Sequence, residues 1–282
     1  MIIVFDVGGT KTRVAGSLDG KEFIGEPKVY DTPQNFEDGM QELGKVVKEI
    51  LNGEKIDAII GGAPGPLNKQ KTELSRAPNL VKWAWKPLRE ELQKIAGDGQ
   101  VILENDTALV ALGEATNGTG KGHKIVAYMT VSTGVGGARI VNGKIDQNAL
   151  GFEPGHQVIN FDGPNCTGCG VNGHLESYVS GRDIEFRYKM KPYEIADPKV
   201  WDELARYLSC GVNNTLIHWS PDILVIGGSM MKRVGIPLDS VKQYVKQFTK
   251  ILPETPLIEL ASLGDWGGLY GGLELYRQSK GQ

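Results

Sequence analysis

The chain has 282 residues, which is long for one compact core and suits two lobes of ordinary domain size. Its 31 basic and 34 acidic residues leave a formal net charge of −3 with no long run of either sign, so the charge pattern argues against nucleic-acid binding. No apolar stretch approaches the roughly 18 residues needed to span a bilayer, and three cysteines fit a reducing compartment better than a disulfide framework. We therefore expect a cytoplasmic protein with a small soluble partner, and neither nucleic acid nor membrane as a partner.

Two glycine turns in similar settings are the strongest signal. The first is Asp6-Val7-Gly8-Gly9-Thr10-Lys11, which follows an apolar strand and precedes a second strand and the hairpin signal Asp19-Gly20. The second half of the chain repeats this order around Ser132-Thr133-Gly134-Val135-Gly136-Gly137, with the hairpin signal Asn142-Gly143. The chain is therefore predicted to be internally duplicated.

Each glycine turn alone is most simply a tight hairpin. Two copies in matching positions, each with hydroxyl side chains beside the glycines, favour phosphate binding, because glycine lets backbone N–H groups approach phosphate oxygens. Two strand-turn-strand loops that face each other across a cleft would hold a polyphosphate from both sides. Neither turn has the spacing of the common phosphate loop or of the dinucleotide fingerprint, which argues against those two kinds of site.

The elements in between alternate in a way that indicates an α/β fold with a parallel core. In the first half, helices are predicted over residues 36–51, 85–95 and 105–115, and strands over 56–60 and 101–103. In the second half, hairpin strands from about 123 to 145 precede a glycine-rich, polar stretch at 151–173. Helices follow at 174–188, 200–219, 238–251 and 267–278, and strands at 223–226 and 257–261.

The best linker candidate is the short glycine-rich segment 117–122. It divides the chain into an N-terminal lobe at 1–117 and a C-terminal lobe at 118–266. A final helix within 267–282 is of the kind that commonly crosses back to the first lobe, although spacing alone does not prove this.

Glu104-Asn105-Asp106 lies where a predicted strand gives way to a helix. In a parallel sheet, ligands bind outside the carboxyl ends of the strands, so a carboxylate here would point at substrate. Helix capping by Asn105 or Asp106 is an equally good interpretation of these residues alone. Two phosphate-binding turns favour the first interpretation, because phosphoryl transfer commonly uses an Asp to accept the proton of the attacking hydroxyl.

Two further loops are expected near this crevice. The segment Gly62-Ala63-Pro64-Gly65-Pro66 also follows a strand and would shape the rim, which makes Gly65 a candidate substrate contact. Asn79 lies in the next loop. Trp83 and Trp85 are set aside because tryptophan more often packs in a core than it forms a ligand platform.

A cluster of metal-ligand residue types follows in the second half. Its four members are His156, Cys166, Cys169 and His174. Four nitrogen and sulfur donors suit a closed tetrahedral zinc site that would hold a long loop together. A redox dithiol and two unligated cysteines are the alternatives, and no thioredoxin-like unit supports the dithiol.

Polar side chains beside these features suit a polyol, whose hydroxyls need several acceptors. Glu153 and Glu176 bracket the cysteine loop and would by default be surface carboxylates. The set with sugar-binding character is Asn79, Asn105, Asp106, Glu153, His156 and Glu176.

Together these segments resemble the ROK family, named for repressors, open reading frames and kinases, within the sugar kinase and actin-like ATPase superfamily. The two glycine turns resemble the family's phosphate motifs, Glu104-Asn105-Asp106 its catalytic segment and Glu153-Pro154-Gly155-His156 its sugar-binding segment. Ile226-Gly227-Gly228-Ser229 resembles the adenosine motif, and residues 263–269 the C-terminal segment. The resemblance covers nearly the whole chain and implies a duplicated ribonuclease-H-like (actin-like ATPase) two-lobe fold with a cleft between the lobes.

The resemblance also implies roles. Asp106 would be the general base, and Asn79, Asn105, Glu153, His156 and Glu176 would hold the sugar. His156 would ligate zinc through one ring nitrogen and meet the sugar with the other, so that the metal organises the site without taking part in the chemistry. The residues implied to hold ATP and Mg²⁺ are Asp6, Gly8, Gly9, Thr10, Lys11, Thr133, Gly134, Gly227 and Gly228.

Two departures from the family pattern matter. The zinc segment usually reads C-x-C-G-x-x-G-C, whereas here an extra residue separates Cys166 from Cys169 and His174 replaces the last cysteine. The number of ligands survives, but the geometry and affinity come into question. Trp266 also stands where the family usually has a small residue.

The sequence thus predicts an ATP-dependent hexokinase of the glucokinase type, with Mg²⁺ oriented by Asp6 and with structural zinc. N-acetylmannosamine, N-acetylglucosamine, mannose, fructose and allose kinases of the family share these residues, so the sugar stays open. A sugar-sensing regulator would need a DNA-binding domain before a motif that begins at Asp6, and an idle sugar-binding module would lack Asp106. We also expect a homodimer, for which the residues themselves carry no signal.

Overall fold

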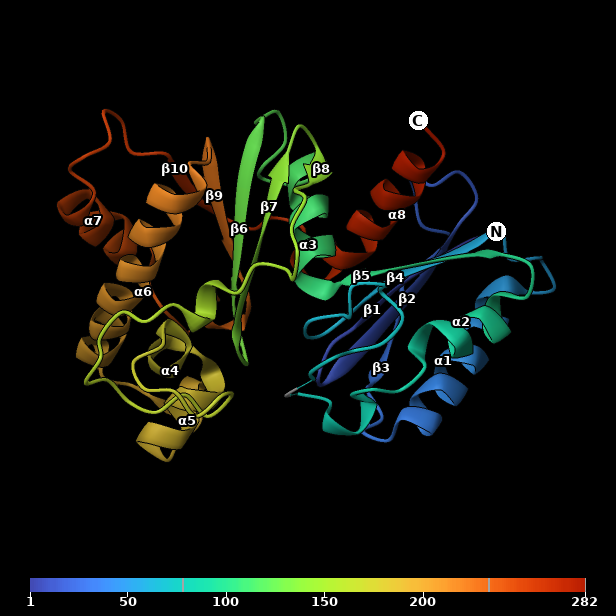
Figure 1. The fold of residues 1–282 in the computed structure, drawn as a ribbon, viewed down its shortest axis with the longest axis horizontal. Coiled ribbons are helices and arrows are strands. Elements are labelled where there is room, and N and C mark those ends of the chain that lie inside the picture. Colours follow the sequence, from blue (N-terminus) through green and yellow to red (C-terminus); the bar gives the residue numbers. More distant parts are fainter. Residues whose placement is uncertain (78, 233, 282) are drawn as a thin grey trace. The chain divides into compact units, whose positions relative to one another are not determined.

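The computed structural model describes residues 1–77, 79–232 and 234–281, and the chain divides into two compact units. The first unit comprises Met1–Asn117, Gln147–Gly151 and the residues from Asp265 onward. The second comprises Gly118–Asp146 and Phe152–Gly264. Each unit is built on a five-stranded mixed sheet flanked by helices (Figure 1).

The first unit has the strand order β3-β2-β1-β4-β5. Strands β1 and β2 are antiparallel, and β4 and β5 continue the sheet parallel to β1. Its elements are β1 (Ile2–Val7), β2 (Lys11–Ser17), β3 (Lys28–Asp31), α1 (Phe36–Leu51), β4 (Ala58–Ala63), α2 (Leu88–Ala96), β5 (Gln100–Asn105), α3 (Asp106–Thr116) and α8 (Gly267–Ser279).

Strand β1 shows why this sheet is covered on both faces, because its side chains alternate and all of its aliphatic residues are buried. Ile3 and Phe5 belong to a core with residues of α1 and α2. Val4 packs with Leu269 and Leu273 of α8 on the opposite face. Figure 1 shows α1 and α2 together on one side of this sheet and α8 on the other.

The second unit has the order β10-β9-β6-β7-β8. Replacing β1–β5 by β6–β10 turns one sheet order into the other, and the parallel and antiparallel pairs also correspond. The predicted duplication and α/β fold are therefore confirmed. The elements are β6 (Ile125–Val131), β7 (Val135–Val141), β8 (Lys144–Ile145), α4 (Leu175–Val179), α5 (Gly181–Tyr188), α6 (Pro198–Trp219), β9 (Ile223–Gly227), α7 (Leu238–Phe248) and β10 (Leu257–Leu260).

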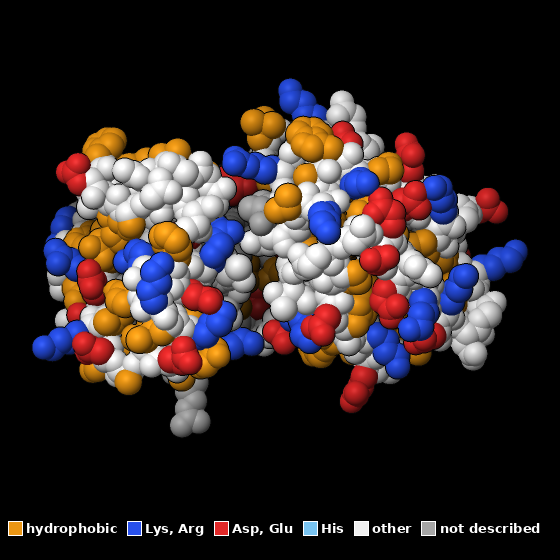
Figure 2. Space-filling view, turned by 90° about the horizontal axis from the view of Figure 1, so that it is seen from below, with side chains coloured by type: hydrophobic (Ala, Val, Ile, Leu, Met, Phe, Trp, Pro, Cys, Tyr) orange, Lys and Arg blue, Asp and Glu red, His pale blue; other side chains and the backbone are white. Residues whose placement is uncertain are grey.

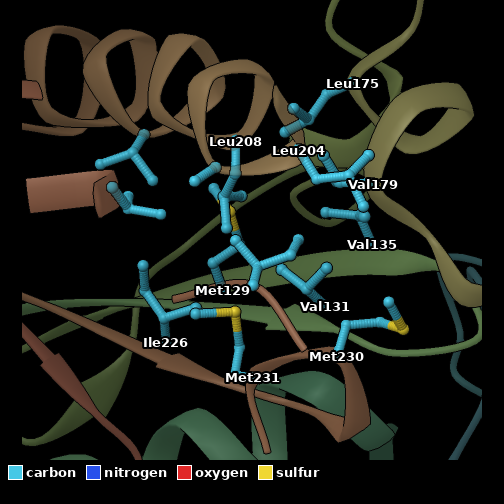
Figure 3. Packing of buried hydrophobic residues seen from close by; sticks show 14 of the residues in the cluster. Met129, Val131, Val135, Leu175, Val179, Leu204, Leu208, Ile226, Met230 and Met231 are labelled. Atoms are coloured by element: carbon cyan, nitrogen blue, oxygen red, sulfur yellow. The ribbon is translucent and has the colours of Figure 1, made fainter. Parts of the chain in front are cut away.

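The core of the second unit lies between one face of its sheet and helices α4, α6 and α7. Figure 3 shows Val131 and Val135, which flank the second glycine turn, together with Leu175 and Val179 of α4. All four side chains are at most 4% exposed. The turn between Val131 and Val135 is thus anchored at both ends in a packed core.

Local sequence explains the best-predicted helix, α1, whose predicted and observed limits agree. The side chain of Asn35 caps it by accepting the N–H of Asp38 at 3.1 Å. Asn52 ends it in the left-handed conformation at φ +44°. The buried residues recur at helical spacing: Phe36, Met40, Leu43 and Val47.

Three predicted helices were wrong in their limits. The helix predicted at 238–251 ends at Phe248. The helix predicted at 174–188 is broken at Ser180, whose backbone is extended and whose hydroxyl accepts the N–H of Asp183 as the cap of α5. The helix predicted from residue 85 begins only at Leu88, because Trp85 has φ +60° and Pro87 follows.

The distribution of charge on the surface and the length of the helices agree with what the composition predicts. On the face seen in Figure 2, acidic and basic side chains are interspersed. Within 1–77, 79–232 and 234–281, every helix is too short or too polar to cross a bilayer.

Candidate active site

Asp106 is the first residue of α3, directly after the carboxyl end of β5. The preceding Asn105 is the helix cap, since its Oδ1 accepts the N–H of Ala108 at 3.1 Å. The Oδ1 of Asp106 accepts the N–H of Thr107 at 2.7 Å. The capping interpretation therefore applies to Asn105, whereas Asp106 presents a carboxylate at a helix N-terminus, where a negative charge is favoured.

Asp6 lies at the end of β1, opposite Gly62 of the neighbouring strand β4. A β-carbon on Gly62 would lie 2.7 Å from the Cα of Asp106, so glycine is what allows α3 to begin this close to the sheet. A β-carbon on Gly268, in the first turn of α8, would lie 2.9 Å from Cγ of Asp6. Glycines thus let two carboxyl groups sit near the starts of two helices at one edge of the sheet.

The electrostatics of these carboxyl groups reflect their burial. Burial, and then the charge of Asp106, raise the pKa of Asp6 to about 7, while Arg13 opposes the shift. Burial also raises the pKa of Asp106 to about 6, against the opposing hydrogen bonds from Thr107. Oxygen ligands that are costly to ionise without a counter-charge suit a hard divalent cation such as Mg²⁺.

Arg13 was missed in the sequence analysis. Its guanidinium lies 3.9 Å from Oδ2 of Asp6 and 3.6 Å from Oδ2 of Asp265. The signal was available, because Arg13 pairs with Asp6 in the register of the β1–β2 hairpin. Cross-strand neighbours of opposite charge attract each other, and Arg13 thereby holds the first turn near the start of α8.

The first glycine turn lies against a predicted sugar residue. A β-carbon on Gly9 would lie 2.8 Å from Cβ of Asn79. The N–H of Gly8 donates to the carbonyl of Lys11 at 2.9 Å, which closes the turn. Thr10 is exposed, and exposed Lys11 forms a 2.7 Å ion pair with Asp31.

The backbone conformation at Gly65, in the predicted rim loop, requires glycine. It has φ +108°, and a β-carbon would lie 2.2 Å from the carbonyl oxygen of Arg76. Asn105 donates its side-chain amide to the carbonyl of Gly65 at 3.2 Å. Gly65, Asn105 and Asp106 therefore lie together, with Asn79 beside the first turn.

The second glycine turn contacts the predicted adenosine motif. The hydroxyls of Ser132 and Ser229 are 3.0 Å apart. Gly228 has φ +99°, and a β-carbon there would lie 2.2 Å from the carbonyl oxygen of Val131. A β-carbon on Gly227 would lie 2.4 Å from the hydroxyl of Tyr128. Thr133 is exposed at the tip of the turn.

The four predicted metal ligands come together. His156, Cys166, Cys169 and His174 have ligand atoms that all lie within 4.8 Å of one another. The Nδ1 atoms of the two histidines are 3.1 Å apart, and Sγ of Cys169 is 3.2 Å from Nδ1 of His174. Tetrahedral zinc bonds of about 2.0 Å to nitrogen and 2.3 Å to sulfur place neighbouring ligand atoms roughly 3.3–3.8 Å apart, so the donor set fits zinc despite the altered spacing.

Burial of the Cys166 and His174 side chains agrees with a role in holding the loop together. It raises the pKa of the Cys166 thiol to about 12 and, followed by the influence of His156, lowers the pKa of His174. A zinc ion would reverse the first effect by binding the thiolate. Neutral histidines are the form that ligates metal.

The two carboxylates predicted to bind sugar differ in their surroundings. Glu153 comes just before a 3-10 turn, Pro154–His156, that packs on β7, where a β-carbon on Gly155 would lie 2.2 Å from the carbonyl oxygen of Val135. Glu176 is buried in α4, and its Oε2 accepts the N–H of Val135 at 2.8 Å. The default expectation of a surface carboxylate is wrong for Glu176. It lies between the second glycine turn and the cysteine loop.

Comparisons with known proteins place these features in context. A model described as the ROK family matches residues 2–279. A glucokinase from Streptomyces coelicolor is 28% identical over 99% of this chain and 98% of its own, and an N-acetyl-D-glucosamine kinase from Salmonella paratyphi C is 29% identical over 96% and 98%. The crystal structure of a ROK family glucokinase from Streptomyces griseus with glucose and AMPPNP superposes with a TM-score of 0.83 at 26% identity, covering 98% and 99% of the two chains.

Proposed function

The chain belongs to the ROK family, and from this premise we propose that it is an ATP-dependent sugar kinase that phosphorylates the 6-hydroxyl of a hexose, with glucose as the first candidate. The observation that carries the proposal is the setting of Asp106. It is a half-buried carboxyl with a raised pKa at the carboxyl end of a strand, next to a second half-buried carboxyl and to the loops of Gly65 and Asn79.

Asp106 is proposed as the general base. It accepts the proton of the sugar hydroxyl as the oxygen attacks the terminal phosphorus in line. A pKa of about 6 leaves the carboxylate ionised at neutral pH, yet closer to the operating pH than an ordinary Asp, which favours proton transfer. The adjacent Thr107 N–H fixes one carboxylate oxygen and so orients the other.

Asp6 is proposed to orient Mg²⁺, with Arg13 balancing charge beside it. When bound, Mg²⁺ would neutralise charge on the phosphates. The turn of Gly8, Gly9, Thr10 and Lys11 is proposed to bind phosphate through the N–H groups of Gly9 and Thr10 and the side chain of Lys11, because the N–H of Gly8 already donates to the carbonyl of Lys11. The turn of Thr133 and Gly134 is proposed to bind phosphate as well. Gly227 and Gly228 are proposed to bind adenosine because they lie in the segment that resembles the family's adenosine motif; in the structure their lack of side chains lets this segment pack closely against Tyr128 and Val131.

The sugar contacts are proposed to come from Gly65, Asn79, Asn105, Glu153, His156 and Glu176. His156 turns Nδ1 to the cysteine loop, which leaves Nε2 for a sugar hydroxyl. Zinc is proposed on His156, Cys166, Cys169 and His174, where it fixes that ring. A homodimer in the cytoplasm stays part of the proposal.

N-acetylglucosamine is the second candidate substrate, because kinases for it are as similar to the chain as the glucokinases are. A coupled assay of ADP release with glucose, N-acetylglucosamine, N-acetylmannosamine, mannose, fructose and allose separates these candidates. The proposal predicts sugar-dependent ADP release with ATP and Mg²⁺, and a 6-phosphate product by ³¹P NMR. Absence of ADP release with every sugar, from protein that binds ATP, would instead indicate a sugar-sensing or idle member.

A further inference from the structure

A dense polar network connects the cysteine loop to the second glycine turn, and its centre is Arg182. Its Nη2 donates to Oε1 of Glu176 at 2.7 Å, and its Nε donates to the hydroxyl of Thr167 at 2.8 Å. Thr167 lies inside the cysteine loop, between Cys166 and Cys169. One guanidinium therefore holds the loop and the buried Glu176 together.

The same residues reach the turn from the other side. Glu176 accepts the N–H of Val135 with its second oxygen at 2.8 Å. The backbone N–H of Arg182 donates to the carbonyl of Thr133 at 3.3 Å, and that of Gly181 to the carbonyl of Ser132 at 2.7 Å. The start of α5 thus holds the turn that is proposed to bind phosphate.

The fit leaves little room for independent movement. A β-carbon on Gly134 would lie 2.7 Å from Oε2 of Glu176, and one on Gly168 would lie 2.7 Å from Nη2 of Arg182. Leu175 and Val179, on either side of Glu176, are buried in the core that contains Val135 (Figure 3). Thr167 is held again by its N–H, which donates to Asp183 at 2.9 Å.

We propose that Arg182 is a positioning residue that couples the metal loop to nucleotide binding, so that zinc occupancy sets the affinity for ATP and ADP. The inference rests on the proposed function. A metal that fixes Cys166 and Cys169 also fixes Thr167 between them. Arg182 and Glu176 connect Thr167 to the N–H of Val135 and to the carbonyls of the turn, so an ordered loop keeps the turn ordered. Without the metal, the turn must be ordered when the nucleotide binds, which weakens binding.

Coupling between two sites is reciprocal, and this gives the test. The affinity for ADP with Mg²⁺ is measured by calorimetry on the full chain loaded with Zn²⁺ and after removal of Zn²⁺ by a chelator. We expect loaded protein to bind ADP about tenfold more tightly, within the usual range for such coupling. The affinity for Zn²⁺, measured by competition with a chromophoric chelator, should rise by the same factor when ADP is saturating.

Arg182→Leu should bind ADP weakly whether or not Zn²⁺ is bound, and Arg182→Lys should restore part of the coupling. Thr167→Val keeps all four metal ligands and removes only the hydroxyl that Arg182 contacts, so it should lose coupling with its fold intact. Lys191→Leu, which removes an exposed cation after the same helix, is the matched control and should behave like the parent.

The outcomes separate the two proposals. If the parent protein does not bind ADP at all, the proposed function fails. If it binds ADP with the same affinity with and without Zn²⁺, or if Thr167→Val and Arg182→Leu keep the full coupling, the inference about Arg182 is overturned while the kinase proposal stands.

Discussion

Replacing Asp6 by Asn should stabilise the fold at alkaline pH while removing magnesium-dependent activity. The pKa of Asp6 rises from 3.8 to about 7, so the folded protein binds a proton that the unfolded chain has already lost. The stability that this group contributes is present below about pH 4 and is lost as the pH rises through 7. Asn keeps the shape of the side chain without the charge.

The size of the effect follows from the same shift. A difference of about 3 pKa units at 1.36 kcal/mol each corresponds to about 4 kcal/mol, which is an upper value. Because the side chain is 13% exposed and shares its field with Asp106, we take about 2–3 kcal/mol at pH 8.5. For a chain of this size that is roughly 3–5 °C in Tm.

The assay is thermal unfolding of the parent and Asp6→Asn at pH 5 and pH 8.5, without Mg²⁺ or nucleotide. The difference in Tm at pH 5 should be about a third to a half of that at pH 8.5, because the unfolded chain has already lost its proton at pH 5 whereas Asp6 of the folded protein is still protonated. Asp98→Asn, at an exposed turn, is the control and should change neither value. A gain of equal size at both pH values, or a loss at pH 8.5, would refute the electrostatic reasoning.

Three further predictions concern the site around Asp106. Its raised pKa predicts that kcat/KM for the sugar falls about tenfold per pH unit below pH 6, as a pH profile of initial rates will show, and a flat profile down to pH 5 would contradict it. Lys71→Met removes the ion-pair partner of buried Glu104 and should lower kcat by about 10- to 100-fold. The double variant with Glu104→Gln should recover activity, and absence of recovery would show that the pair does not matter. Gly62→Ala places a methyl group 2.7 Å from Cα of Asp106 and should cost about 1–3 kcal/mol of stability together with most of the activity, and a fully active, stable protein would contradict the packing.

The fold was largely predictable because periodic burial and turn chemistry are local. The duplicated strand-turn-strand pattern follows from apolar runs, glycine turns and hairpin signals, whereas the order of the strands within each sheet was not predicted. Helix α1 was predicted to its ends because cap, apolar stripe and C-terminal Asn agree. Ser180 and Trp85 broke predicted helices through side-chain capping and a left-handed backbone, which periodicity does not report.

The candidate site was predictable in its residue types but not in its connections. The convergence of His156 with the cysteine loop followed from ligand chemistry and spacing. The burial of Glu176 depends on α4 packing beside β7, and the contacts of Arg182 depend on the start of α5 lying against the second glycine turn; both involve residues distant in sequence. The position of Arg13 was more predictable than these contacts, since the hairpin register alone places it opposite Asp6.

The central claim is that Asp106 takes the proton of the attacking sugar hydroxyl. The most direct measurement is the single-turnover rate of phosphoryl transfer from ATP to the preferred sugar by Asp106→Asn, with sugar affinity measured in parallel by calorimetry. We predict a rate about 10²–10⁴-fold below that of the parent, with sugar affinity changed little. A variant that binds sugar normally and transfers phosphate at close to the parent rate would contradict the claim.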